Sequence, residues 1–410
     1  MKHTNYSGGL VETAANQPRH SRLEIFQVAL RLGLTSFGGP VAHLGFYHNE
    51  YVIRRKWIDE TTYAHLVALC QFLPGPASSQ LCFSIGMARG GLTGGLLAWL
   101  GFTLPSAVLM IAFGYGVNAL GAMGETHWLH GLKIAAVAVV AQAVWVMAKK
   151  LCPDRSRVTV ALVAACVVLQ CPLALSQFCV IACGGIAGWY LFGKDEAEPG
   201  PLQSMKSVSY TQGAIALAAF FSLLIGLPIL ASVLPNKALS YADAFYRSGA
   251  LVFGGGHVVL PLLKAEVVKP GWVSENVFLA GYGIAQALPG PLFAFAGYLG
   301  AVAKFEPNGV TGGLLCLTAI FLSPLLLLVG VMPFWEHLRR QPAAQACLKG
   351  TNAAVVGVLL AAFYNPVWTS GVNNPRDFIL ALASFGLLVF WNWPPWLIVI
   401  LAALTGWAFL

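Results

Sequence analysis

The stretch TSFGGPVAHLGF at residues 35–46 puts two glycines and a proline in the middle of an apolar segment. A second break, QFLPGP, follows at residues 71–76. Both breaks return later in the same order, as FGGG at 253–256 and QALPGP at 286–291. Clusters of glycine and proline interrupt an α-helix. The sequence therefore predicts four interrupted helices in two corresponding pairs.

These breaks belong to a repeat that covers most of the chain. Arg31 corresponds to Arg247 at a separation of 216 residues. The Leu-Lys pair at 132–133 returns at 348–349 with the same separation, where the lysines suit anchors at helix ends. Two related halves are common in membrane transporters, which bind their substrate at the interface of the repeats.

The composition excludes a soluble protein. Of 410 residues, 57% are hydrophobic and only 10% are charged, and the mean hydropathy is +0.71. Soluble domains carry about 25% charged residues. Several apolar segments approach the ~20 residues that span a bilayer as a helix, and they lack the two-residue alternation of a β-barrel. We therefore expect an all-α polytopic membrane protein.

The distribution of positive charge predicts the topology. If segments 24–47 and 62–88 are re-entrant hairpins, Arg54-Arg55-Lys56 and Lys149-Lys150 fall on one face, the cytoplasmic one. If the broken segments crossed fully, Arg54-Arg55-Lys56 would face outside. The second half then starts from the opposite face. We therefore expect an inverted repeat with broken, re-entrant helices at the Gly/Pro motifs.

The same pattern gives a domain organisation, with the protein multi-pass in the inner (plasma) membrane. We expect a polar cytoplasmic N-terminus at 1–23, without the apolar core of a signal peptide. A first domain follows at 24–193, then a cytoplasmic linker and connecting transmembrane helix at 194–239, and a second domain at 240–410.

The breaks also indicate what is transported. Acidic side chains, which cation transporters normally need inside the membrane, are nearly absent from the apolar segments. Half-helices that begin after a break offer free N–H groups and a positive dipole end, and glycine allows close approach. This suits a small anion bound near the midplane. The candidate substrate-binding residues are Arg31, Ser36, Gly38, Gly39, His43, Gln71, Gly75, Arg247, Gly254, Gly255, His257, Gln286 and Gly290.

Some of these residues have a second interpretation. Arg31 and Arg247 could pair with Glu24 and Asp243 instead of binding substrate. His43 could be a satisfied core histidine or a proton relay. The sequence has no C-x-x-C pair, haem motif or dinucleotide fingerprint, so we expect no catalytic residue, metal or cofactor, and no enzyme.

The paired motifs resemble one family. TSFGGPVAHLGFYHNEYVIRRKWIDE with QFLPGPASSQL, followed by FGGGHVVLPLL with QALPGPLFAFAGYLG, is similar to the chromate ion transporter family in its long two-domain form. The resemblance covers nearly the whole chain. It implies chromate export from the cytoplasm, driven by the membrane potential or the proton gradient, and hence chromate resistance. The second half departs from the pattern, because Gly256 replaces the proline and His257 does not align with His43, which suits one asymmetric site.

The resemblance also implies which molecules the protein binds. We expect chromate and the lipid bilayer as partners, and no nucleic acid. Sulfate and protons remain possible further substrates, and a homodimer remains possible. We expect one half to rock against the other around a single dianion site. The alternatives are a transporter or channel for sulfate or another oxyanion and a membrane-bound chromate reductase, which would need a flavin, haem or nicotinamide site.

Overall fold

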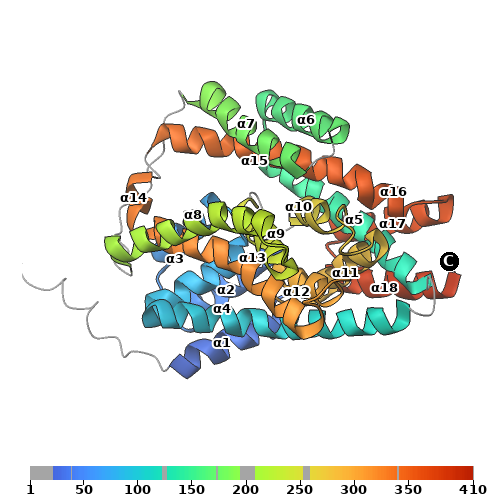
Figure 1. Ribbon diagram of the computed structural model, residues 1–410, viewed down its shortest axis with the longest axis horizontal. Coiled ribbons are helices and arrows are strands. Elements are labelled where there is room, and N and C mark those ends of the chain that lie inside the picture. Colours follow the sequence, from blue (N-terminus) through green and yellow to red (C-terminus); the bar gives the residue numbers. More distant parts are fainter. Residues whose placement is uncertain are drawn as a thin grey trace, which may run out of the picture.

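The computed structural model of the protein describes residues 22–37, 39–121, 127–171, 174–193, 208–252, 259–338 and 341–409. This part of the chain is helical and contains no β-strand, as predicted. Residues 1–21 and most of the predicted linker, 194–207, lie outside it, so the predicted domain boundaries stay a prediction. Figure 1 shows the arrangement of the helices.

The helices follow the repeat. The first half contains α1 (Arg22–Thr35), α2 (Gly39–Tyr47), η1 (His48–Arg54), α3 (Glu60–Phe72), α4 (Ala77–Gly121), α5 (His127–Leu151), α6 (Arg155–Gln170) and α7 (Ala174–Phe192). The connecting helix is α8 (Tyr210–Val233). The second half contains α9 (Lys237–Ala250), α10 (Val259–Val267), α11 (Glu275–Ala287), η3 (Leu292–Ala294), α12 (Phe295–Ala301), α13 (Gly309–Val331), η4 (Met332–Phe334), α14 (Trp335–Leu338), α15 (Pro342–Ala362), η5 (Phe363–Trp368), α16 (Thr369–Gly371), α17 (Pro375–Val389) and α18 (Pro395–Phe409).

Both broken segments of the first half return to the end where they begin. Arg55 Nη1 lies 2.8 Å from Glu24 Oε1, which joins the two ends of the segment α1–η1. Arg89 Nη1 donates to the Trp57 carbonyl at 3.4 Å, which joins the two ends of the next segment. We call the cluster of Glu24, Arg55, Trp57 and Arg89 the first mouth. These contacts confirm the re-entrant hairpins.

The second half closes its hairpins in the same way. Tyr241 Oη donates to the Phe305 carbonyl at 2.9 Å, and the Tyr241 and Trp272 rings lie 4.7 Å apart. The Lys304 amide donates to the Trp272 carbonyl at 3.0 Å. We call the cluster of Tyr241, Trp272, Lys304 and Phe305 the second mouth.

Helix α4 consists of two antiparallel helices. The backbone leaves the helical conformation at Gly90 and Gly91, and Gly91 has a φ of +64°. Beyond this reversal, Cys82 Sγ donates to the Ala98 carbonyl at 3.6 Å, although one continuous helix would separate these residues by about 24 Å. The part before Gly90 is therefore the returning arm of the second hairpin, and the part after Gly91 crosses the membrane.

The two mouths lie at opposite ends of the long arm of α4. That arm begins near Arg89 at the first mouth, and further along it Tyr115 Oη accepts from the Val310 amide at 3.2 Å, next to the second mouth. The described residues include five stretches long and apolar enough to span a membrane, of which the first contains the reversal in α4. They are Ala77–Val117, His130–Leu151, Tyr210–Val233, Gly309–Phe334 and Pro342–Gly371. The halves are thus two repeated units that open at opposite ends.

The helices sort into two layers, and each layer draws on both halves (Figure 1). The hairpin layer contains α1–α4 and α8–α13. The scaffold layer contains α5–α7 and α15–α18, in which α5 packs on α17 and α18 while α15 packs on α6 and α7. The two halves are therefore interlocked in both layers. This packing argues against rocking of one half as a body against the other, and that motion stays a prediction.

Candidate functional site

The four breaks meet at the centre of the repeat. The Gly75 amide donates to the Val252 carbonyl at 2.6 Å, and the Gly290 amide donates to the Ser36 carbonyl at 3.0 Å. Ser36 corresponds to Val252, and Gly75 to Gly290, so the two bonds are copies of one contact between halves. We call the cluster of Ser36, Gly75, Val252 and Gly290 the junction.

Only glycine fits the two donor positions of the junction. Gly75 has a φ of +125° and Gly290 a φ of +94°, in the region that side chains disfavour. A Cβ at Gly75 would collide with Pro324 Cβ, and one at Gly290 would lie 2.8 Å from Ser106 Oγ. The duplicated Pro-Gly-Pro motif is thus explained by a backbone contact that each half makes with the other.

The first break adds buried polar atoms to the junction. His43 Nε2 lies 3.2 Å from the Ser36 carbonyl oxygen, and the His43 ring packs edge-on against Phe102. Both Ser36 and His43 are at most 1% exposed. Among the described residues, Ser36 Oγ and His43 Nδ1 have no hydrogen-bond partner. Leaving such an atom unpaired costs about 1–3 kcal/mol, so both atoms could bind a polar ligand or ordered water.

The helix turn after Gly75 contains polar residues that the sequence analysis missed. Ser78, Ser79 and Gln80 are buried at the start of α4, and Gln80 Nε2 donates to the Pro74 carbonyl at 3.0 Å. Ser79 Oγ and Gln80 Oε1 have no hydrogen-bond partner within the described part of the chain. A helix start also presents free N–H groups. Together these groups can bind an oxyanion.

The matching turn of the second half has no such groups. It reads Leu292-Phe293-Ala294-Phe295, where the first half reads Ala77-Ser78-Ser79-Gln80. The junction is therefore symmetric in its backbone, but the serines and the glutamine of this turn are present in the first half only. Comparison of the two halves position by position would have identified these serines from sequence, because the surrounding motif is otherwise shared.

The two corresponding arginines differ in their partners. Arg247 binds both carboxylate oxygens of Asp243 at 2.8 Å and Glu266 Oε2 at 3.1 Å. This guanidinium is thus paired with two carboxylates through Nε and Nη2. The alternative pairing with Asp243 is observed, and the expected role of Arg247 in compensating the charge of a substrate stays a prediction.

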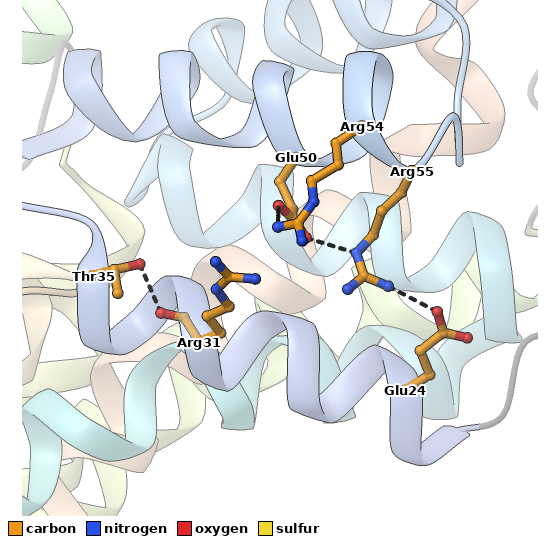
Figure 2. Close-up of polar contacts among 6 residues, drawn as sticks. All are labelled: Glu24, Arg31, Thr35, Glu50, Arg54 and Arg55. Atoms are coloured by element: carbon orange, nitrogen blue, oxygen red, sulfur yellow. Dashed lines mark hydrogen bonds and ion pairs between the residues drawn. The ribbon is translucent and has the colours of Figure 1, made fainter.

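Arg31 is exposed on α1 (Figure 2). Its carbonyl accepts from Thr35 Oγ1, but its guanidinium has no hydrogen bond or ion pair among the described residues. Glu24, the expected partner, pairs with Arg55 instead. Figure 2 shows the Arg31 side chain pointing toward the helix that carries Glu50. Arg31 is thus a cation available to an anion beside the first mouth.

Two glutamates at corresponding positions have opposite electrostatics. Burial raises the pKa of Glu266, and the charge of Arg247 offsets this only in part. Burial acts in the same direction on Glu50, but hydrogen bonds from Arg55 at 2.6 Å and Arg54 at 3.1 Å outweigh it and hold the pKa of Glu50 below its ordinary value. The first mouth therefore keeps its glutamate ionised.

The remaining candidates fall into three groups. Gln71 is exposed at the end of α3, away from the buried junction, whereas Gln286 in α11 has a buried Nε2 without a partner among the described residues. Gly39 begins α2 directly after the first break. Four further candidates lie outside the described residues, namely Gly38, Gly254, Gly255 and His257.

Comparison with known proteins matches both halves to one family. The family described as "Chromate transporter" matches residues 23–189 and 239–407. The chain is 28% identical over 408 residues to the chromate transport protein of Pseudomonas aeruginosa, covering 96% of this chain and 94% of that one. It is 27% identical to the chromate transport protein of Cupriavidus metallidurans, covering 93% and 91%. A probable chromate transport protein of Synechococcus elongatus is 26% identical, with 92% and 97% covered. No solved structure matches the chain.

Proposed function

The chain belongs to the chromate transporter family, and from this premise we propose that it exports chromate from the cytoplasm as a secondary transporter. The observation that carries the proposal is the junction. Two reciprocal backbone bonds join the breaks of both halves around buried polar atoms of Ser36, His43 and Ser79 that have no partner among the described residues. The transported species is a tetrahedral oxyanion, and sulfate, which has the same shape and charge, is its expected competitor.

The polar side of the junction supplies the binding chemistry. Hydroxyls of Ser36 and Ser79 donate to oxyanion oxygens, and the amides at the start of α4 add their dipole. Arg31 lies nearer the first mouth, where it attracts the dianion before the anion reaches the junction. His43 is the proposed proton carrier of a coupled cycle, because its Nδ1 lies in the same cluster without a hydrogen-bond partner in the described part of the chain.

The orientation follows from charge. Arg54, Arg55 and Arg89 lie at the first mouth, and Lys149-Lys150 end α5, whose start lies by the second mouth. Cytoplasmic ends of membrane proteins carry the excess of Lys and Arg, so the first mouth faces the cytoplasm. Export of a dianion is then electrically downhill, by ~2.3 kcal/mol per charge per 100 mV.

The test is uptake of radiolabelled chromate into everted membrane vesicles with an imposed potential. Wild type should accumulate chromate, and excess sulfate should compete. Ser36→Ala and Ser79→Ala should each lower uptake by about tenfold, the effect of losing one hydrogen bond to a charged group. Ser232→Ala, on the exposed face of α8, is the matched control and should transport normally.

Two results decide against parts of the proposal. Absence of chromate uptake by wild type under any gradient would refute chromate as the substrate. Uptake that is unchanged when the pH gradient is collapsed at fixed potential would leave the potential as the driving force and remove the role of His43 as a proton carrier.

A further inference from the structure

The Leu-Lys pair that the repeat duplicates makes different contacts in its two copies. Leu132 is 1% exposed, and Lys133 Nζ donates to Asn276 Oδ1 at 2.8 Å. Leu132 also lies so close to α11 that a Cβ on Gly283 would approach its carbonyl oxygen to 2.8 Å. These contacts hold α5 of the scaffold layer against α11 of the hairpin layer, beside the second mouth.

A polar seam surrounds this contact. It contains a pocket of about 410 Å³ lined by His130, Lys133, Ser274, Glu275, Asn276, Ser370 and Asn373. Ser370 Oγ donates to Glu275 Oε1 at 2.7 Å, which ties α16 to the start of α11. His130 Nε2 lies 3.0 Å from Asp377 Oδ1 within the scaffold layer. Side chains of both layers thus meet at this end.

The second copy of the pair makes its printed contact within its own layer, where Lys349 Nζ lies 5.9 Å from the centre of the Phe192 ring of α7. Leu348 and Lys349 lie on α15, where both are only half-buried. By the repeat, the helix that corresponds to α11 is α3, yet among the described residues α15 has no packing on α3 comparable to that of α5 on α11. Among the described residues, the scaffold layer therefore packs on the hairpin layer beside the second mouth, without a matching packing of α15 on α3 beside the first.

The face of α3 that would receive the pair is free. Ala64, Ala68 and Gln71 are all exposed, and their spacing places them on one side of the helix. The corresponding residues of α11 are Leu279, Gly283 and Gln286, of which Leu279 and Gly283 are buried. The exposed face of α3 is thus the counterpart of the face that α5 covers on α11.

We propose that these two seams are the two gates of the transport cycle, the second closed and the first open in this structure. The first gate closes when Leu348-Lys349 docks on the face of α3 formed by Thr61, Ala64 and Ala68. This inference rests on the proposed transport function. It adds that the scaffold layer and the hairpin layer are the two parts that move relative to each other. In an inverted repeat, exchanging the contacts of the two halves converts one access state into the other.

The charges at the two seams agree with this exchange. Lys133 lies beside Glu275, which is already paired with Lys264 at 3.4 Å. At the first seam Glu60 occupies the place of Glu275, and His48, the counterpart of Lys264, pairs with it at 2.8 Å. A docked Lys349 would therefore meet the same arrangement of a carboxylate with one basic partner that Lys133 meets now.

Paired cysteine substitutions test the gates in membranes without any substrate. His130→Cys with Ser274→Cys spans the closed seam and leaves the bond between Lys133 and Asn276 intact, and Lys349→Cys with Thr61→Cys spans the open one. A short flexible bis-maleimide is added, and mass spectrometry identifies the specific linked peptides apart from those of native cysteines. We expect the 130/274 link to form at least about tenfold more than the 349/61 link, a ratio that one charged hydrogen bond can set.

The exchange itself is tested by weakening the closed gate. Lys133→Ala in the 349/61 background should raise the 349/61 link several-fold, and Lys133→Arg should not. Equal links at both seams in the two double-cysteine variants, or a 349/61 link that does not rise with Lys133→Ala, would overturn the inference. Since no transport is measured, this outcome is independent of whether chromate is the substrate.

A second variant tests closure of the first gate in transport. Ala68→Trp fills the receiving face of α3, so it should abolish chromate uptake while the protein still elutes as a folded species. Ala218→Trp, on the exposed face of α8, adds the same bulk elsewhere and should transport normally. Normal uptake by Ala68→Trp would show that this face stays uncovered throughout the cycle and would overturn the inference.

Discussion

The two mouths are built from corresponding segments, yet their arginines are paired differently. Beside the first, Arg54 and Arg55 pair with Glu50 and Glu24, and Arg31 has no partner among the described residues. Beside the second, the corresponding Arg247 pairs with both Asp243 and Glu266. Since the junction between them keeps its two-fold backbone contact, the halves have diverged in how their arginines are paired while the shared framework has been kept.

This difference gives a direction to an otherwise symmetric molecule. An anion can reach Arg31 beside the first mouth, whereas Asp243 and Glu266 neutralise the charge of Arg247 beside the second. A single substitution accounts for much of the contrast, because Asp243 corresponds to Gln27, so the second mouth has a carboxylate one helical turn from its arginine and the first mouth does not. The following predictions test whether charge or packing is what separates the two mouths.

The largest effect is expected from Arg247→Ala. The substitution leaves Asp243 and Glu266, whose side chains are 10% and 11% exposed, without their shared cation. The free energy of unfolding should fall by about 3 kcal/mol, the low end for breaking a buried pair because Arg247 itself is a quarter exposed. Thermal unfolding in detergent measures this.

Arg54→Ala is the control for Arg247→Ala at the first mouth. Arg54 is 54% exposed, and Glu50 keeps its closer bond to Arg55, so the unfolding temperature should change little. Equal destabilisation by the two variants would mean that the second mouth is no more dependent on its arginine than the first.

The sequence predicted the framework of this molecule better than its site. The length of the apolar segments predicted the helices, and the duplicated breaks predicted the repeat. The clusters of Arg and Lys predicted the re-entrant hairpins. All three properties depend on local patterns in the sequence. Whether Arg31 or Arg247 is paired could not be predicted, because it depends on which of several nearby carboxylates each reaches in three dimensions. Ser79 and Gln80 could have been predicted by comparing the two halves. The two layers could not, because they depend on which helices pack together over long distances in the sequence.

Arg31→Ala is predicted to lower chromate uptake by about tenfold, as loss of one charge interaction of ~1.4 kcal/mol would. The unfolding temperature should stay close to that of wild type, since the guanidinium has no protein partner among the described residues. Arg31→Lys should keep part of the activity, and the deficit of Arg31→Ala should shrink at high salt. Unimpaired uptake by Arg31→Ala would assign attraction of the anion to Arg54, Arg55 and the helix dipoles.

Gln27→Asp would convert the first mouth into a copy of the second. The new carboxylate lies one turn before Arg31, as Asp243 does before Arg247, and such a pair adds only about 0.3–0.5 kcal/mol to helix stability. We therefore expect chromate uptake to fall several-fold with an unchanged unfolding temperature. Gln27→Asn is the matched neutral control. If Gln27→Asp transports like wild type, pairing of the arginine is not what distinguishes the two mouths.

The smallest expected effect is a pH dependence of opposite sign at the two mouths. The pKa of Glu266 is raised above its ordinary 4.5, so the folded protein binds this proton more tightly and stability falls as pH rises just above 4.5. The pKa of Glu50 is lowered, so the unfolded chain binds the proton more tightly and stability rises with pH just below 4.5. Unfolding temperatures measured between about pH 3.5 and 6.5 test both effects. In Glu266→Gln the fall in unfolding temperature above pH 4.5 should disappear, and in Glu50→Gln the rise below pH 4.5 should disappear. Disappearance of the same change in both variants would contradict the electrostatic difference, because corresponding carboxylates would then have equivalent surroundings.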